Sequence, residues 1–293
     1  VISNAGTFTM NSNLDHVLSG VMGGAGTLVK NNADATLTLA ATNTMTGNIT
    51  VNAGTLVGTS GGAFGANGLS RSITVAAGAT LRYDVGNIFQ PFSSSNLPTL
   101  TVAGTVINNF GNNNALTNVN LNGGTITATA GSPTYGAFRY NGTVTSTGDS
   151  TISTSDPVTG RMMLRDEGSV FNVTSGTLTI SAPLAAVLRE GNLGVFVKNG
   201  AGDLLLTGAN TYSGSTTLNG GITTVSGSGT LGSGVAALAV NNAGTTLNLS
   251  TTLDTSVGSL SGTGAAVINL GGSARNLTVR QTAAATFAGD ILG

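Results

Sequence analysis

The sequence predicts an all-β protein in which short strands stack in parallel coils, a β-solenoid. Only 7 % of its 293 residues are charged, whereas exposed helical faces are normally built from charged residues. Glycine occurs 45 times, and threonine, valine, serine, alanine and asparagine fill much of the remainder, which favours strands separated by turns. Apolar residues make up 40 % of the chain, so its length suffices for a sizeable core.

An internal repeat supports stacking. Segment 28–54, LVKNNADATLTLAATNTMTGNITVNAG, aligns with segment 196–221, FVKNGAGDLLLTGANTYSGSTTLNGG, when one residue is gapped. Each copy has the pattern of short strands separated by glycine-containing corners. Strands this short can bury one face in a continuous core when they lie one above another. The expected core residues include Leu37, Leu39, Leu204, Leu206 and Leu218.

The second copy resembles the passenger-associated transport repeat, also called the autotransporter-associated β-strand repeat. The residues that carry this resemblance are Lys198, Gly200, Gly202, Leu204, Leu206, Gly208, Asn210, Tyr212 and Gly214. The first copy departs from this pattern: Asn32 stands where the pattern has its first glycine, and Met45 stands where it has the tyrosine. It keeps Lys30, Leu37, Leu39, Asn43 and Gly47.

The resemblance implies a right-handed parallel β-helix from the passenger of a bacterial surface protein. It therefore also implies an extracellular or cell-surface location. In that family the repeat is structural and is associated with secretion, and it has no catalytic residue to carry over. The resemblance covers about two repeats directly, and the stretch near 70–190 is only β-helix-like in style.

A second periodicity indicates the coil length. The motif around Arg165 recurs around Arg189. The number of residues between them is a plausible length for one coil. We therefore expect roughly 20–24 residues per coil, roughly 12–14 coils and a rod ~60 Å long, because parallel strands lie ~4.8 Å apart. Stacking of the two motifs predicts a surface ladder of Arg165, Asp166, Arg189 and Glu190. We expect residues 1–293 to form one continuous solenoid, which continues into further repeats of a longer chain or stacks end to end with itself.

Composition also narrows the function. The chain has no cysteine and a single histidine, His16, which argues against a metal site. A serine triad would have to use His16, with a partner such as Asp15, but the G-x-S-x-G motif is missing and a surface histidine is the expectation. A net charge of −1 gives no reason to expect nucleic acid, and no run of about 18 apolar residues predicts a membrane span. We expect no cofactor.

A polysaccharide-degrading enzyme is one alternative, because glycoside hydrolysis needs two carboxyl groups. The densest acidic patch comprises Asp156, Asp166, Glu167 and Glu190, accompanied by Arg161, Arg165 and Arg189. The competing interpretation is that these charges balance one another on an exposed face, and we favour it. We therefore predict no enzyme and assign no catalytic, cofactor-binding or metal-binding residue.

An adhesin is the second alternative. Segment 86–98 contains Pro91 and Pro98, which cannot donate to a central ladder, so we predict a loop that leaves the rod, and segment 131–140 has the same character. The similar triplets at 82–84 and 139–141 could form a polar and aromatic surface patch, or their tyrosine rings could cover the core. Our leading expectation is a structural stalk, spacer or filament, and the alternative binds a host or matrix glycan or protein through these loops.

Overall fold

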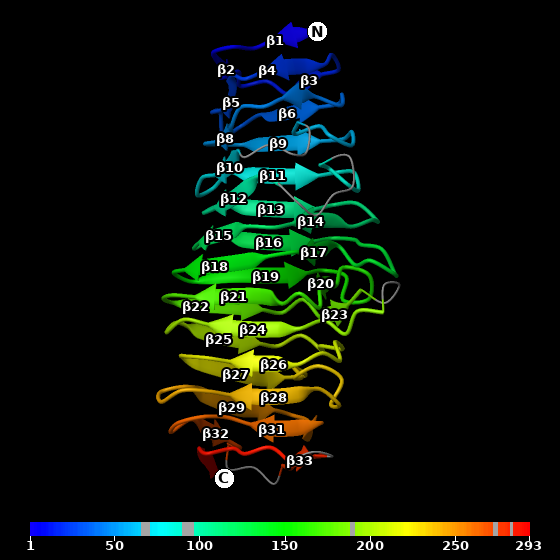
Figure 1. Ribbon diagram of the computed structural model, residues 1–293. Helices are drawn as coiled ribbons and strands as arrows, with labels where there is room; N and C mark the ends of the chain where they lie inside the picture. Colours follow the sequence, from blue (N-terminus) through cyan, green and yellow to red (C-terminus); the bar gives the residue numbers. More distant parts are fainter. Residues whose placement is uncertain (66–70, 90–96, 188–190, 272–274, 282–283) are drawn as a thin grey trace.

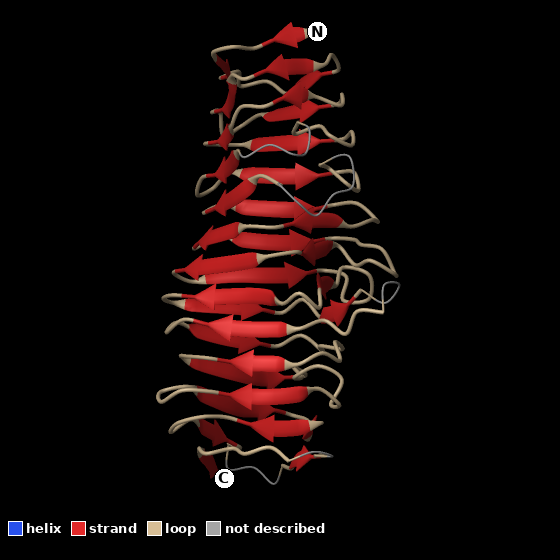
Figure 2. Cartoon of the chain, viewed as in Figure 1, coloured by secondary structure: helices blue, strands red, loops and turns tan. Residues whose placement is uncertain are grey.

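The computed structural model describes residues 1–65, 71–89, 97–187, 191–271, 275–281 and 284–293. Within these ranges every regular element is a β-strand, and the strands stack into a rod with the two termini at opposite ends (Figures 1 and 2). All pairings between named strands are parallel, so the predicted all-β parallel solenoid is confirmed.

Two long sheets form the walls of the rod. The first has 12 strands, in the order β2 (Thr7–Met10), β5 (Thr27–Lys30), β8 (Ile49–Val51), β10 (Ser72–Val75), β12 (Thr99–Val102), β15 (Val119–Asn122), β18 (Thr143–Thr147), β21 (Ser169–Val173), β24 (Phe196–Asn199), β26 (Thr216–Leu218), β28 (Ala237–Val240) and β31 (Ser259–Ser261). The second has 13 strands, in the order β3 (His16–Leu18), β6 (Thr36–Leu39), β9 (Thr55–Gly58), β11 (Thr80–Tyr83), β13 (Thr105–Asn108), β16 (Thr125–Ala128), β19 (Ser150–Thr154), β22 (Thr177–Ile180), β25 (Asp203–Leu206), β27 (Ile222–Gly227), β29 (Thr246–Thr251), β32 (Val267–Asn269) and β34 (Asp290–Leu292).

Three short sheets occupy the third side of the coils. They are β1 (Ile2–Ser3), β4 (Met22–Gly24) and β7 (Thr44–Met45); β14 (Asn114–Leu116), β17 (Phe138–Tyr140), β20 (Met162–Leu164) and β23 (Leu184–Ala186); and β30 (Thr255–Val257) with β33 (Leu277–Val279). The four-stranded sheet lies where the rod bulges in Figure 1.

The coils vary in length more than the sequence predicts. The coil that begins at Leu100 is shorter than expected, because Leu100 pairs with Val119, whereas Phe171 pairs with Lys198 across a coil longer than expected. The predicted range of coil lengths is therefore too narrow. The strands keep a constant spacing because the ladder requires it, so extra residues collect in the turns. Leu164 pairs with Ala186, a shorter offset than the one that separates Arg165 from Arg189 in the sequence.

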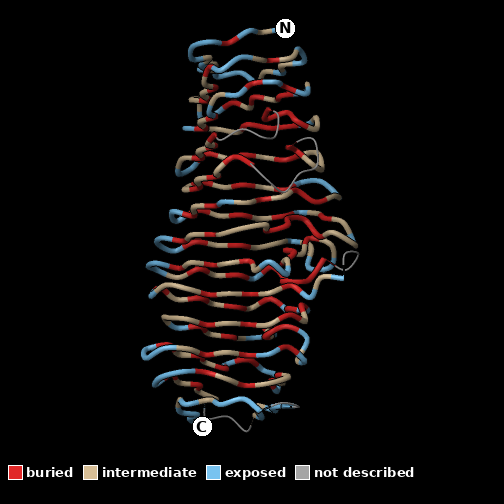
Figure 3. The backbone as a smooth tube through the Cα atoms, in the orientation of Figure 1, coloured by how far each residue is buried: buried red, intermediate tan, exposed pale blue. Residues whose placement is uncertain are grey.

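Alternation along each strand builds the core. In β6 and β25 the leucines at every second position are buried and the residues between them are partly exposed. Figure 3 shows buried residues in successive coils along the rod, with many exposed residues at the turns. On the outer face of the second sheet, in-register threonines follow one another along successive strands: Thr36, Thr55, Thr80, Thr105, Thr125, Thr151 and Thr179. This wall is almost uncharged.

Candidate functional site

The repeat lysine is the strongest polar feature inside the rod. Lys198 lies on β24 with its side chain buried, and its Nζ donates to the carbonyl oxygens of Gly200 at 2.7 Å and Gly202 at 2.6 Å. It also donates to the Gly220 oxygen of the next coil. The ammonium therefore links the corners of two successive coils through charge-assisted hydrogen bonds.

Glycine is required where these corners approach one another. Gly200 has φ +86°, and a Cβ there would lie 2.2 Å from the Val173 oxygen. A Cβ at Gly221, which has φ +63°, would lie 2.6 Å from Lys198 Nζ. The K-x-G-x-G pattern thus supplies both the lysine ammonium and the glycine backbone that can approach it closely.

Burial lowers the pKa of Lys198 to about 8, and the negative charge of Asp203 opposes this shift. The folded protein therefore binds this proton less tightly than the unfolded chain. Between pH 8 and the ordinary lysine value, only the unfolded chain holds the proton, so the free energy of unfolding should rise with pH across this window. Below pH 8 both states hold the proton, so this group no longer changes the free energy of unfolding with pH.

We predict that the wild type gains stability relative to Lys198→Met as the pH rises from 8 to 10.5. Urea unfolding of both proteins at several pH values measures the difference, and the buried tyrosines cancel because both proteins contain them. A difference that stays flat or falls over this range would show that the carbonyl groups hold the ammonium pKa near its usual value.

Lys30 occupies the matching place in the first repeat. It is also buried, and its Nζ donates to the Asn32 oxygen and, at 3.3 Å, to the Ala53 oxygen of the next coil. Burial lowers the pKa of Lys30, and Asp15 opposes the shift. The link between coils persists although Asn32 replaces a glycine.

A buried asparagine in each repeat joins three coils. Asn210 Oδ1 accepts from Leu184 N at 2.8 Å, and its Nδ2 donates to the Thr230 oxygen at 2.7 Å. Asn43 repeats this arrangement with Met22 N at 2.7 Å and the Ala63 oxygen at 2.6 Å. The side-chain amide thus replaces a backbone ladder at a corner where the strands are interrupted.

A third buried asparagine, Asn114, also links successive coils. Asn114 Oδ1 accepts from Ile88 N of the previous coil at 2.7 Å, and its Nδ2 donates to Asn108 Oδ1 at 3.0 Å. In the sequence Asn114 is one of several asparagines between residues 108 and 122, a stretch that favours structural hydrogen bonds between coils but does not single out this residue.

Aromatic rings fill the interior beside these polar groups. Tyr212 stacks on Phe196 with ring centroids 6.1 Å apart, and Phe196 stacks on Phe171 at 5.0 Å. The Tyr212 hydroxyl hydrogen-bonds Thr216 Oγ1 at 2.7 Å. In the first repeat Met45 fills the corresponding position and is also buried. These stacked rings stabilise the core, since each aromatic pair contributes about 1 kcal/mol to stability beyond the burial of its surface.

The remaining repeat residues form the core or the tight corners of the coils. Leu37, Leu39, Leu204 and Leu206 are buried, each almost or wholly inaccessible to solvent. The corner glycines would clash if they carried a Cβ, which would lie 2.2 Å from the Gly26 oxygen at Gly47, 2.7 Å from the Ala182 oxygen at Gly208 and 2.4 Å from the Gly194 oxygen at Gly214. Gly202 is equally crowded, with Val173 Cγ1 at 2.8 Å.

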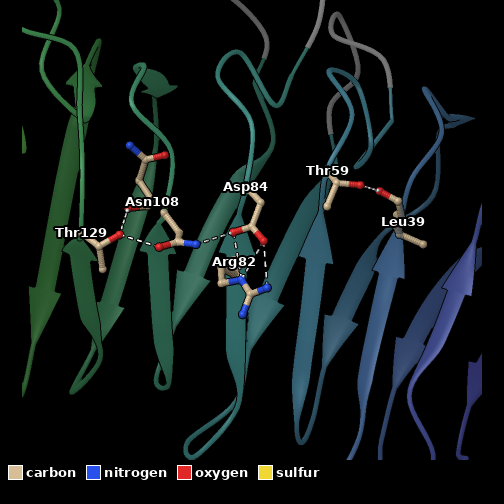
Figure 4. Close-up of polar contacts among 7 residues, drawn as sticks. Leu39, Thr59, Arg82, Asp84, Asn108 and Thr129 are labelled. Carbon is tan, nitrogen blue, oxygen red and sulfur yellow. Dashed lines mark hydrogen bonds and ion pairs between the residues drawn. The ribbon is translucent and has the colours of Figure 1, made fainter.

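The triplets at 82–84 and 139–141 do not form an aromatic surface patch. The rings of Tyr83 and Tyr140 are buried in the core, because both tyrosines occupy inward-facing strand positions. Figure 4 shows what remains on the surface at the first triplet. Arg82 pairs with Asp84 at 2.8 Å, and Asn109 Nδ2 of the next coil donates to Asp84 Oδ1 at 3.1 Å. These polar groups satisfy one another.

The acidic patch is divided among separate structural roles. Asp156 accepts hydrogen bonds from Thr159 and Val158 within its own turn, which lowers its pKa. Asp166 Oδ1 accepts from Leu193 N at 2.6 Å and Gly194 N at 2.8 Å. Glu167 pairs with Arg165 at 3.0 Å, and this contact lowers the pKa of Glu167. Both carboxylates with lowered pKa values are poorly suited to act as a general acid at neutral pH.

Arg189 and Glu190 of the predicted surface ladder lie outside the described residues. The ladder that would join them to Arg165 and Asp166 therefore remains a prediction.

The predicted loops are more deeply anchored than expected. Residues 90–96 of the first segment lie outside the described residues, but Ile88, Phe89 and Leu97 beside them are buried. In the second segment the residues 137–140 are buried, and the exposed part is confined to residues around Pro133. Buried residues thus anchor the described parts of the first segment and the second half of the second segment in the core.

His16 lies on β3 and does not engage Asp15. Its Nε2 hydrogen-bonds Ser12 Oγ at 2.8 Å, whereas Asp15 Oδ1 accepts from Thr36 N at 2.6 Å. The carboxylate is therefore committed to the next coil. Among the described residues, no group of three or more histidine, aspartate or glutamate side chains could hold a metal ion.

The described chain also contains no helix of the length and apolarity that crossing a bilayer demands.

Comparison with known proteins agrees with this arrangement. The passenger-associated-transport-repeat family matches residues 28–57 and 196–225, the two segments that carry the buried lysines and asparagines. The adhesin BmaC autotransporter of Brucella suis biovar 1 (strain 1330) is 36 % identical over 126 residues. That match covers 41 % of this chain and 3 % of the relative, so the chain corresponds to a small part of that protein. No solved structure matches the chain.

The matched family and this relative are a passenger repeat and an adhesin rather than enzymes, and an autotransporter passenger is secreted or displayed at the cell surface. The chain is a parallel β-solenoid that carries autotransporter passenger repeats.

Proposed function

We propose that this chain is a rigid spacer in the passenger of a bacterial autotransporter, with no enzymatic role. The observation that carries the proposal is the continuity of the two long sheets, whose strands keep parallel register from β2 to β31 and from β3 to β34. One buried core runs along the same coils. Repeats of this kind contact only their neighbours, so length can change by whole coils without altering the architecture.

The outer walls support the same role. The in-register threonines of the second sheet present small uncharged side chains, and the net charge of the whole chain is only −1. Such a surface offers little electrostatic attraction to other macromolecules. End-to-end stacking with a second copy, or with further repeats, would lengthen the spacer by the same parallel pairing.

We predict that deletion of residues 29–49 leaves a folded protein, because Leu28 pairs with Ile49 and the deleted segment is one coil. Small-angle X-ray scattering should give a rod shortened by about 4.8 Å, the spacing between strands. Deletion of residues 29–39 removes only part of that coil, puts the corners out of register and should unfold the first coils. Equal behaviour of the two deletions would contradict the spacer account.

The functional test places an epitope before Val1 within a complete autotransporter displayed on cells. We expect antibody binding to intact cells to survive the whole-coil deletion and to be lost with the partial deletion. If whole-coil deletion instead abolished display while the protein remained folded, a spacer role would be untenable.

The second candidate is an adhesin, which the adhesin relative favours. Its binding groups would lie on the exposed part of segment 131–140, where Pro133 is exposed and Thr134 partly exposed. An array of immobilised glycans and matrix proteins, probed with the wild type and with a variant in which residues 132–135 are replaced by glycine and serine, tests it. Specific binding that the replacement removes would favour the adhesin over the plain spacer.

A further inference from the structure

A polar pocket opens on the third side of the rod, one coil after the buried Asn210 and Tyr212 of the second matched repeat. It lies between the turn 229–234, which follows β27, and residues 251–256 of the next coil, and its volume is about 230 Å³. Neither the spacer role nor the predicted loops involve it.

The hollow exists because a glycine-rich turn replaces a large side chain. In the preceding coil Tyr212 fills this corner with a buried ring. In the turn 229–234, Gly232 and Gly234 have φ +70° and +79°, and a Cβ at Gly232 would lie 3.1 Å from Tyr212 Cε2. Bare backbone therefore forms one wall of the pocket, and no side chain of this turn fills it.

The groups that face the pocket can both donate and accept hydrogen bonds. Ser233, Thr255 and Ser256 line it, and their side chains make no hydrogen bond within the described part of the chain. Thr255 is buried, whereas Ser256 is partly exposed. Asp254 accepts from Asn276 N at 2.9 Å through Oδ1 and from Asn276 Nδ2 at 3.4 Å through Oδ2, which leaves further lone pairs on the carboxylate.

Apolar side chains complete the lining. Leu231 is buried at the base, and Leu253 is 47 % exposed at the rim. Val235, directly after the turn, is 61 % exposed. An exposed leucine and valine beside a polar hollow give a surface on which the C–H groups of a ligand can pack.

The charges around the pocket favour a neutral ligand. The carboxylate of Asp254 repels anions. Its charge is already stabilised by hydrogen bonds from Asn276 and, to a lesser degree, by the positive charge of Arg275, which together lower its pKa. A neutral compound with several hydroxyl groups and apolar C–H faces matches the hydroxyls, the carboxylate and the leucines together. A hollow of about 230 Å³ suits one sugar unit rather than a long oligosaccharide.

We propose that the pocket between residues 229–234 and 251–256 binds a single unit of a neutral glycan. Ser233 and Ser256 exchange hydrogen bonds with sugar hydroxyls, Asp254 accepts one, and Leu253 packs against the ring. The site adds a binding function to the spacer and does not depend on it.

Titration of the full 293-residue chain with the methyl glycosides of glucose, galactose, mannose and N-acetylglucosamine tests the site, followed by ¹H–¹⁵N spectra. We expect at least one glycoside to shift the amide signals of residues 229–234 and 251–256 saturably, with a Kd in the millimolar range. If none of the four gives saturable shifts there, the proposal is overturned.

Two variants locate the binding. Ser256→Leu fills the hollow and should weaken binding at least tenfold, and Asp254→Asn, which changes fewer atoms and covers the case in which the leucine variant does not fold, should weaken it severalfold. The matched control is Asp149→Asn, since Asp149 Oδ1 accepts from Thr177 N at 2.9 Å in the same manner but does not line the pocket. Unchanged affinity in both pocket variants, or equal loss in the control, would overturn the assignment.

Discussion

Replacing Leu206 with aspartate will unravel the coils around β25. Leu206 is completely buried, and its in-register neighbours are Ile180 in the coil before and Val225 in the coil after. A carboxylate there has no partner of opposite charge on either side. An uncompensated buried charge costs about 4 kcal/mol, a large fraction of the stability of most proteins.

Because each coil contacts only its neighbours, the damage should spread from the substituted coil rather than unfold the rod uniformly. Limited proteolysis with mass spectrometry should therefore find new cleavage sites near β22, β25 and β27, together with a lower melting temperature. The matched control is Leu205→Asp, on the same strand but facing outward and partly exposed. Wild-type protease resistance of Leu206→Asp, or equal damage from Leu205→Asp, would refute the core assignment.

Replacing Asn210 with alanine will cost about 3 kcal/mol, the second-largest effect that we expect. The substitution leaves Leu184 N and the Thr230 oxygen without their partners, and each unsatisfied buried group costs about 1–3 kcal/mol. Urea unfolding measures the loss.

Asn219→Ala provides the comparison for that variant. Asn219 also uses its amide in both directions, to Asn199 Oδ1 at 2.8 Å and from Asn241 Nδ2 at 3.0 Å, but it lies at a partly exposed corner where water can replace these bonds. We expect a loss below about 1 kcal/mol. A cost for Asn210→Ala no greater than that for Asn219→Ala would contradict the bridging role of the buried asparagine.

The sequence was sufficient for the fold class and for the faces of the strands. Alternation in TLTL of β6 identifies the inward leucines, because a strand places every second side chain on the same face, and the repeat alignment carries these positions to Leu204 and Leu206 of β25. Glycines at the corners mark where the chain must turn. These are local rules, so a single repeat suffices to apply them.

The coil lengths and the buried charged and polar groups could not be predicted in the same way. Turns can absorb extra residues without disturbing the ladder, so the long coil between Phe171 and Lys198 leaves no periodic signal. Lys198 in a strand resembles an exposed lysine until the carbonyl groups of the next coil are placed beside it. Such groups depend on contacts between coils, which only the assembled stack reveals.

The stacking of each coil on the next is tested most directly by engineered disulfides, since the chain has no cysteine of its own. Thr105 and Thr125 are in-register partners on adjacent coils, and Thr151 follows Thr125 one coil further on. Neighbouring strands lie ~4.8 Å apart, within the Cα separation that a disulfide spans, whereas two coils exceed it. The parallel stack predicts that Thr105→Cys with Thr125→Cys cross-links under mild oxidation and that Thr105→Cys with Thr151→Cys does not. Failure of the first pair, or equally efficient cross-linking of the second, would contradict it.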